Sequence, residues 1–358
     1  MTNCPYAVLP GTGWQAVDMS VISEQASSAK TPLDPDEIAR ATELLGQVQR
    51  SFAAMIVGQE RLRTALLVTM LAEGHLLMES VPGLAKTLAA STLAHSLQAR
   101  FVRIQCTPDL LPSDIVGTQV YDPRTHEFDT QLGPVHANIV LLDEINRASA
   151  KTQAAMLEAM QERQTSIAGV VYKLPEPFMV LATQNPIEQE GTYVLPEAQM
   201  DRFLLKEVVD YPTPVDELSV LDRYDDGTLG LHAGEVDGVL SPADIVALQR
   251  MTERVYVDKA VKDYIVRLVH ATRDVGEVSR DLGPYVEFGA SPRGTIAFFQ
   301  VARALALYDG RNHVVPEDVH TLRHGVLRHR IHLTFEAVAD RVRPEEVIDA
   351  VFAAVPAP

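Results

Sequence analysis

The first part of the chain contains short, continuously apolar runs separated by segments with helical spacing. Continuous rather than alternating apolar residues indicate strands that are buried on both faces. Strands that alternate with helices are joined by right-handed crossovers into a parallel sheet. The sequence therefore predicts an α/β domain around a buried parallel sheet. Its predicted strands are "HLLME" (75–79), "FVRIQC" (101–106), "NIVLLDE" (138–144), "FMVLATQN" (178–185) and "RFLLKEVV" (202–209).

The composition around these strands divides the chain into parts. The N-terminal segment carries Pro, Gly, Ser and Thr without periodicity, which is typical of disorder. Asp34 followed by Pro35 is typical of a helix start and marks where structure begins. A second Gly/Asp-rich stretch precedes a region that has helical spacing only. We therefore predict a disordered extension (1–33), an α/β domain (34–215), a linker (216–240) and a helical domain (241–358).

Smaller elements are predicted between and after the strands. The spacing "SIAGVVYKL" (166–174) favours a hairpin around Gly169, and the Pro-, Gly- and Asp-containing stretch 107–138 is predicted to be irregular. No strand is predicted in the helical domain. The predicted helices lie near 34–52, 59–73, 86–97, 150–163, 258–273, 292–309, 316–328 and 343–354.

Charge and cysteine content exclude several classes of protein. The net charge is −17, from 31 basic and 48 acidic residues, so a phosphate backbone would be repelled and nucleic acid is a disfavoured partner. Cys4 and Cys106 form neither a metal motif nor a disulfide framework. A secretory signal and a membrane-spanning apolar run are not evident, so we expect a cytoplasmic protein without membrane insertion.

Histidines gather between residues 313 and 332, where His320 and His324 share a helix face. No carboxylate or cysteine lies at ligand spacing beside them. An amphipathic helix is therefore favoured over a metal site.

The loop after the first predicted strand, "ESVPGLAKT" (79–87), nearly matches a phosphate-binding loop. Such a loop places backbone N–H groups and a helix N-terminus against phosphates. Lys86 would reach the β- and γ-phosphates, and Thr87 would ligate Mg²⁺ through its hydroxyl. Ser80 and Ala85 replace the two usual glycines, whereas Gly83 keeps one flexible position. Taken alone, this match is weak, and a capped helix start that exposes a lysine is the favoured interpretation.

Polar residues at the ends of two further strands strengthen the nucleotide hypothesis. Asp143 and Glu144 end one apolar run, and Asn185 ends another. Ligands bind at the carboxyl ends of the strands in parallel sheets, where the loop also lies. Asp143 would hold Mg²⁺ through water, Glu144 would polarise the attacking water, and Asn185 would orient it.

Five motifs together resemble the MoxR branch of the AAA+ ATPases. They are "VPGLAKT", "LLDEINRA", "ATQNP", "LPEAQMDRF" and "GASPRG", and the resemblance extends from about Val57 to Ile331. It implies a P-loop AAA+ fold, with a five-stranded parallel sheet flanked by helices and an all-α lid domain. The family has Ala where Ala85 stands and usually Gly where Ser80 stands, so Ser80 is this chain's own departure.

The resemblance also assigns roles to individual residues. Arg202 in "DRF" resembles the arginine finger, which acts on the ATP of the neighbouring subunit. Arg293 in "SPRG" resembles the sensor 2 arginine, and Arg147 would lie at a subunit interface. The nucleotide contacts implied by the resemblance are Val57, Gly58 and Gln59 in the adenine pocket, and Val81, Pro82, Gly83, Leu84, Ala85, Lys86, Thr87 and Leu88 in the loop.

The resemblance implies that the chain hydrolyses ATP to ADP and phosphate. It also implies that copies of the chain assemble into a ring, which we expect to be a homohexamer. The implied cofactors are ATP and Mg²⁺. The implied partner is a client protein that the ring remodels or matures, often one with a von Willebrand factor A domain. Two alternatives remain open on the residues: a nucleotide-binding scaffold that does not hydrolyse ATP, and a DNA-remodelling ATPase.

Overall fold

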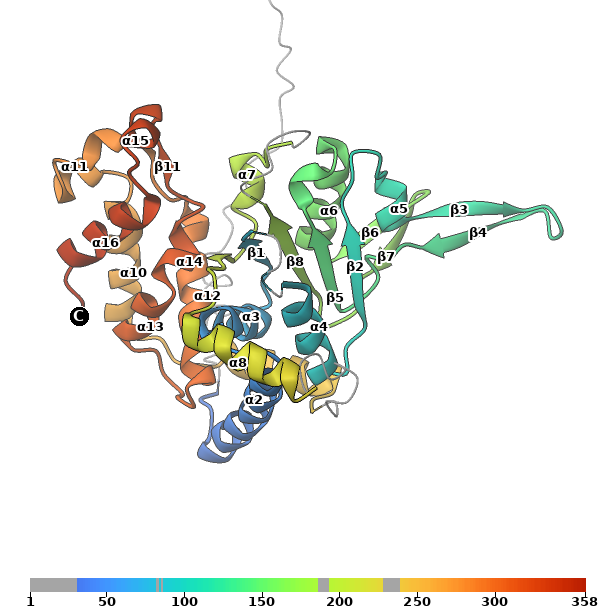
Figure 1. The fold of residues 1–358 in the computed structure, drawn as a ribbon, viewed down its shortest axis with the longest axis horizontal. Helices are drawn as coiled ribbons and strands as arrows, with labels where there is room; N and C mark the ends of the chain where they lie inside the picture. The colour runs from blue at the N-terminus through green and yellow to red at the C-terminus, as the bar shows by residue number, and fades with distance from the viewer. Residues whose placement is uncertain (1–30, 82–83, 85, 186–192, 228–238) are drawn as a thin grey trace, which may run out of the picture. The chain divides into compact units, whose positions relative to one another are not determined.

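The computed structural model describes residues 31–81, 84, 86–185, 193–227 and 239–358. Residues Pro32–Pro358 form one compact unit. Within the described residues, a five-stranded sheet has the order β2-β5-β8-β1-β9 and is parallel throughout (Figure 1). The predicted parallel α/β sheet is therefore confirmed. Its strands are β1 (Leu76–Glu79), β2 (Phe101–Gln105), β5 (Ile139–Asp143), β8 (Met179–Gln184) and β9 (Leu205–Val208).

The register brings the carboxyl ends of the strands to one edge of the sheet. Glu79 at the end of β1 is level with Gln184 of β8, and Gln105 of β2 is level with Asp143 of β5. Strand β5 is apolar along most of its length, and every residue from Ile139 to Leu142 is buried. This burial on both faces explains why the strand has continuous rather than alternating apolar residues.

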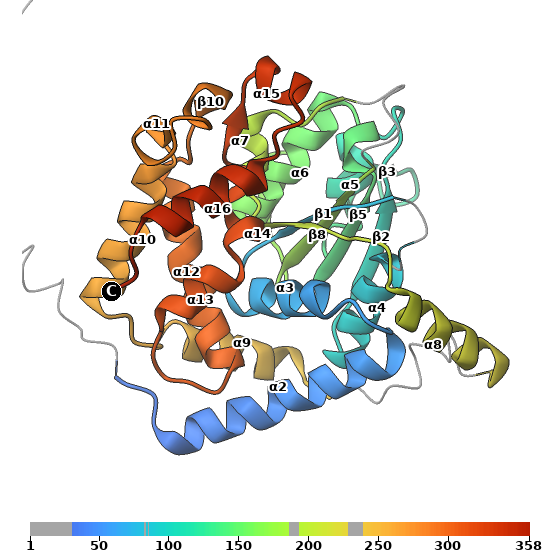
Figure 2. The ribbon, with the colours of Figure 1, turned by 60° about the vertical axis from the view of Figure 1, so that its left-hand side comes forward.

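Helices cover both faces of the sheet. One face packs against α2 (Pro35–Met55), α3 (Glu60–Leu71) and α4 (Lys86–Ser96) in the larger apolar core (Figure 2). The other face packs against α5 (Pro112–Val116) and α6 (Ala150–Glu162) in a second core. The start of α2 is fixed by Asp34, whose side chain caps the helix as the sequence predicts.

The stretch 107–138, which the sequence predicts to be irregular, contains α5 and an antiparallel hairpin. The hairpin pairs β3 (Gly117–Asp122) with β4 (Glu127–Leu132) and projects from the sheet (Figure 1). Most of its side chains are exposed, so no apolar pattern reveals its strands in the sequence. The hairpin predicted around Gly169 is confirmed as β6 (Gln164–Ile167) and β7 (Val170–Lys173), with Gly169 at a φ of 85°.

The C-terminal region is mainly helical, as predicted, with two differences. The helix predicted over 316–328 is divided into two short helices at Leu322, and a short antiparallel pair joins β10 (Val286–Phe288) to β11 (His332–Leu333). The helices are α9 (Pro242–Thr252), α10 (Lys259–Ala271), α11 (Val275–Val278), α12 (Pro292–Tyr308), α13 (Pro316–Thr321), α14 (Arg323–Leu327), α15 (Phe335–Ala339) and α16 (Pro344–Ala354).

Several short elements lie between the larger helices and strands. The 3₁₀ turn η1 (Ile145–Arg147) follows β5, α7 (Glu197–Met200) precedes β9, and η2 (Gly283–Tyr285) precedes β10. Helix α8 (Pro214–Asp225) occupies the first part of the segment predicted as a linker, and Leu33 is buried at the end of the predicted extension. Within the described ranges, no helix is long and apolar enough to cross a membrane.

Candidate nucleotide-binding site

Lys86 begins α4 directly after the loop that follows β1. Its ammonium group donates a hydrogen bond to the Ser80 carbonyl oxygen at 3.4 Å. Partial burial lowers the pKa of Lys86, while the negative charges of Asp143 and Glu144 act in the opposite direction. The lysine therefore shares one electrostatic environment with both carboxylates, as the predicted site requires.

Asp143 is held as an anion at the end of β5. Its Oδ1 accepts a hydrogen bond from the Thr183 hydroxyl at 2.7 Å, and its Oδ2 accepts one from Arg103 Nε at 3.1 Å. Burial by itself would raise the pKa of Asp143, but the bonds from Thr183 and Arg103 outweigh it and keep the pKa below its usual value. Asp143 is therefore ionised at neutral pH.

Glu144 adopts a left-handed backbone conformation, with a φ of 57°. This conformation is unfavourable for a residue with a Cβ and persists only where the surroundings enforce it. Here the Glu144 N–H donates to the Thr183 hydroxyl at 2.8 Å. The Glu144 carboxylate accepts from Gln105 Nε2 at 3.1 Å and from Arg147 Nη1 at 3.2 Å. The backbone strain thus turns this carboxylate away from the direction of β5 and towards polar neighbours at the sheet edge.

Thr183 is a site residue that sequence reasoning missed. It is fully buried on β8, and its single hydroxyl joins the Asp143 carboxylate to the Glu144 backbone. The available signal was a hydroxyl-bearing residue inside the otherwise apolar run "MVLAT". Arg103, also missed, was a lone charge within the apolar run "FVRIQ".

Asn185 follows β8 at the same edge and is buried. It stands beside the loop segment, because the Ser80 N–H donates to the carbonyl of the preceding residue, Gln184, at 3.2 Å. Ser80 is itself buried, its hydroxyl donates to the Val81 carbonyl at 3.0 Å, and it is not among the described residues with a positive φ. A glycine is therefore not required at this position of the loop.

The oxygen atoms present at this edge fit Mg²⁺. Thr87 lies half-buried in the first turn of α4, and Asp143 is an anion close to Lys86. Hydroxyl and carboxylate oxygens are the ligands that Mg²⁺ prefers, usually together with water and phosphate oxygens. The remaining loop residues Pro82, Gly83 and Ala85 lie outside the described residues.

A cavity of about 430 Å³ lies next to α4 and has the size and character of a base pocket. Most of its lining is apolar. It brings together the predicted residues Val57, Gln59, Leu84 and Leu88, and adds Met55, Ile56, Pro212, Glu217, Val220 and Leu221. The last three belong to α8, so this helix forms one wall of the pocket.

Gly58 is needed between Val57 and Gln59 for two reasons. Its φ is 65°, and a Cβ at this position would lie 2.9 Å from the carboxylate of Asp216 on α8. The Gln59 side chain is tied to the segment before α8, because Nε2 donates one hydrogen bond to the Asp210 carbonyl at 3.1 Å. Gly58 therefore lets the segment approach α8 closely and close the pocket.

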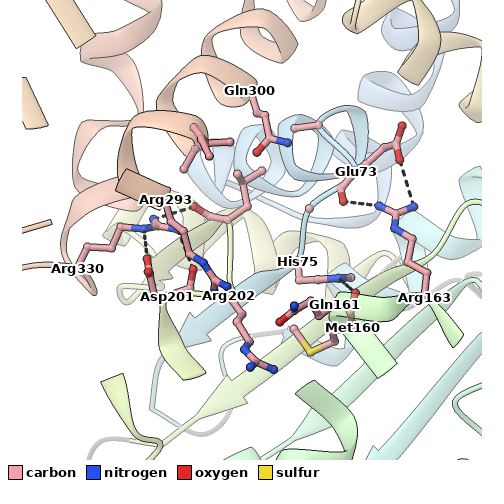
Figure 3. Close-up of a pocket in the computed structure, with 15 residues that line it drawn as sticks. Glu73, His75, Met160, Gln161, Arg163, Asp201, Arg202, Arg293, Gln300 and Arg330 are labelled. Atoms are coloured by element: carbon pink, nitrogen blue, oxygen red, sulfur yellow. Dashed lines mark hydrogen bonds and ion pairs between the residues drawn. The ribbon is translucent and has the colours of Figure 1, made fainter. Parts of the chain in front are cut away.

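Arg202 and Arg293 lie together at a different place. Both line a cavity of about 320 Å³ that also includes Gly74 and His75, which immediately precede β1 (Figure 3). The loop predicted to bind phosphate follows β1, whereas Gly74 and His75 precede it, so these arginines lie at the amino edge of the sheet, opposite that loop. Within the described residues, the exposed Arg293 guanidinium donates no hydrogen bond, and Arg202 donates through Nη1 to the Leu157 carbonyl at 3.3 Å.

The histidines between 313 and 332 have separate partners. His320 Nε2 pairs with the Tyr264 hydroxyl, His324 with Asp349, and His332 with Glu197. Within the part of the chain that the structure describes, no group of three or more His, Cys, Asp or Glu side chains is arranged to hold a metal ion.

A five-stranded parallel sheet flanked by helices and followed by a helical domain is the architecture of the AAA+ class of proteins. The model of the ATPase family associated with various cellular activities (AAA) matches residues 75–205, and the model of the AAA lid domain matches residues 281–351. A solved structure of a putative ATPase from Cytophaga hutchinsonii superposes with a TM-score of 0.84 at 37% identity, covering 95% of this chain and 99% of that one.

Curated relatives narrow the class. The chain is 48% identical to Chaperone MoxR1 of Mycobacterium tuberculosis, over 85% of this chain and 80% of the relative. It is 31% identical to Protein MoxR of Paracoccus denitrificans, over 85% of this chain and 93% of the relative. It is also 42% identical to the uncharacterized protein YeaC of Bacillus subtilis, over 88% and 95%. The chain belongs to the MoxR family of AAA+ ATPases.

Proposed function

We propose that the chain hydrolyses ATP to ADP and phosphate at sites that form between neighbouring subunits of a ring. The observation that carries this proposal is the placement of Arg202 and Arg293 at the sheet edge opposite the loop that contains Lys86. The guanidinium groups of these two arginines lie far from the nucleotide site of their own chain. We infer that they contact the nucleotide bound by an adjoining copy. Such head-to-tail contacts close into rings, and we propose a hexamer.

The described residues divide the chemistry between two subunits. In one subunit, Lys86 binds the β- and γ-phosphates, while Thr87 and Asp143 would hold Mg²⁺, which when bound neutralises charge on the phosphates. Glu144 accepts a proton from the attacking water, and Asn185 orients that water. The adjoining subunit supplies Arg202 and Arg293 to stabilise the charge that develops on the transferred phosphoryl group.

We further propose that hydrolysis drives the remodelling of a client protein. Support comes from the name of the relative Chaperone MoxR1 and from the projecting β3–β4 hairpin. Tyr121 and Phe128 form a cross-strand ring pair on this hairpin, with centroids 5.4 Å apart, and are 47% and 66% exposed. Exposed aromatic pairs of this kind are suited to protein contacts. A protein with a von Willebrand factor A domain is our proposed client.

Phosphate release and nucleotide binding test the proposal together. Wild type should release phosphate in the presence of ATP and Mg²⁺, Glu144→Gln should bind a fluorescent ATP analogue without turnover, and Lys86→Ala should lose binding. Equal and negligible phosphate release by wild type and Glu144→Gln would instead support a scaffold that only binds nucleotide. Stimulation of phosphate release by DNA, together with salt-sensitive DNA binding, would support a DNA-remodelling ATPase.

A further inference from the structure

Arg330, which follows α14, is buried against the segment that carries Arg202. Only 4% of its surface is exposed. Its Nε donates to Asp201 Oδ1 at 2.8 Å, and Nη2 donates to the Phe203 carbonyl at 2.7 Å. Further bonds from the same guanidinium reach the carbonyls of Leu204, Asp201 and Val326. One side chain of the helical domain therefore holds the backbone on both sides of Arg202.

Asp201 extends this network to Ser291, which lies two residues before Arg293. While Oδ1 accepts from Arg330, Oδ2 accepts from the Ser291 hydroxyl at 2.8 Å. Ser291 caps α12, and its Oγ accepts from the Arg293 N–H at 3.1 Å. A single carboxylate thus connects the neighbour of Arg202 to the cap of the helix that carries Arg293. Figure 3 shows the bond between Arg330 and Asp201 in this connection.

The Asp201 carboxylate lies in a cluster of arginine side chains. Asp201, Arg202, Arg293 and Arg330 line the same cavity, so the Asp201 carboxylate has three cations near it. Burial lowers the pKa of Arg330 to about 10, and the guanidinium is still charged at neutral pH. Arg330 and Ser291 each bond to one oxygen of Asp201, and among the described residues this carboxylate forms an ion pair with Arg330 and with neither Arg202 nor Arg293.

We propose that Arg330 is a positioning residue for ATP hydrolysis, which acts through Asp201 and Ser291 to hold Arg202 and Arg293 at a fixed separation and free for the phosphates of the adjoining subunit. This role rests on the proposed function, since it matters only if both arginines act on a neighbour. It is distinct from nucleotide binding, because the network lies at the edge opposite Lys86.

The test substitutes Arg330→Lys, which keeps a positive charge but cannot make the same set of bonds. We expect kcat to fall at least tenfold, while the dissociation constant for ATP changes less than twofold. Arg311→Lys is the matched control. Arg311 also forms a double hydrogen bond to a buried carboxylate of the helical domain, that of Asp318, but contacts neither arginine-bearing segment. Its kcat should match that of wild type.

Ser291→Ala provides an independent, mild variant in case Arg330→Lys folds poorly. It removes one bond to Asp201 and one helix cap, so a smaller fall in kcat with unchanged ATP affinity is expected. A kcat equal to wild type for both Ser291→Ala and a folded Arg330→Lys would overturn the proposal. Equal losses of kcat in Arg330→Lys and Arg311→Lys would also overturn it, by showing a general effect of destabilising the helical domain.

Subunit mixing separates this inference from the proposed function. Arg330→Lys subunits retain an intact loop, and Lys86→Ala subunits retain intact arginines, so their mixture should release phosphate faster than either variant alone. If Arg202→Ala mixed with Lys86→Ala recovers activity but Arg330→Lys mixed with Lys86→Ala does not, the positioning role is wrong and the shared site stands. If neither mixture recovers activity, the shared site itself is wrong.

Discussion

Replacing Thr183 with valine tests whether one buried hydroxyl organises the hydrolytic edge of the sheet. Valine has nearly the same shape, so the change leaves no cavity. It removes the donor to Asp143 and the acceptor for the Glu144 N–H. Asp143 loses a bond that lowers its pKa, and the strained backbone of Glu144 loses the contact that holds it.

The size of the effect follows from these two bonds. A hydrogen bond to a charged group contributes about 1.5–3 kcal/mol, and a buried N–H left without an acceptor costs about 1–3 kcal/mol. Release of the left-handed conformation at Glu144 returns about 1–2 kcal/mol. We therefore expect Thr183→Val to lower the free energy of unfolding by about 3 kcal/mol, within a range of about 0.5–5 kcal/mol. We also expect kcat to fall at least tenfold, since the carboxylate of Glu144 is no longer held in place.

Urea unfolding without nucleotide, followed by circular dichroism, measures the free energy of unfolding. Phosphate release measures kcat. Thr183→Ser is the matched control, because it retains the hydroxyl and loses only a methyl group, at about 1 kcal/mol. If Thr183→Val is as stable and as active as Thr183→Ser, the hydroxyl does not organise the site and the reasoning is refuted.

Three further predictions concern the loop, the base pocket and a buried histidine. Ser80→Gly should weaken ATP binding about two- to fivefold without abolishing it, because glycine adds chain freedom worth about 0.5–1 kcal/mol; unchanged or tighter binding in a fluorescence titration would contradict this. Gly58→Ala should weaken ATP binding and lower the melting temperature, because its Cβ meets the Asp216 carboxylate; equal values for variant and wild type would contradict the packing argument. Burial lowers the pKa of His75 to about 4, whereas its unfolded pKa is about 6.5, so its contribution is complete above pH 6.5 and about 3 kcal/mol is lost as the pH falls towards 4. His75→Gln should flatten this pH dependence in urea unfolding, and an unchanged slope would show that His75 does not cause it.

The placement of the candidate site residues at one edge of the sheet was largely predictable, because these residues follow apolar strands. Asp143 and Asn185 come directly at or after buried runs, and parallel strands place such residues at one edge. Thr183 was not predictable in the same way. Its role depends on β5 and β8 being neighbours in the sheet, which neither strand reveals by itself.

The position of Arg293 could not be read from its local sequence either. The helix predicted near 292–309 is present as α12, with Ser291 as its N-terminal cap. Where this helix lies is decided by contacts distant in sequence, such as Ser291 with Asp201 and Arg330 with Asp201. The β3–β4 hairpin was missed for the opposite reason, since it is local but too exposed to show an apolar pattern.

Mixing Lys86→Ala with Arg202→Ala tests the central claim that each site is shared between two subunits. Each variant alone should release little phosphate. In randomly mixed rings with equal amounts of both, about a quarter of the interfaces would pair an intact loop with an intact arginine. The account predicts recovery towards about a quarter of the wild-type rate. A mixture no more active than the two variants measured separately would contradict it.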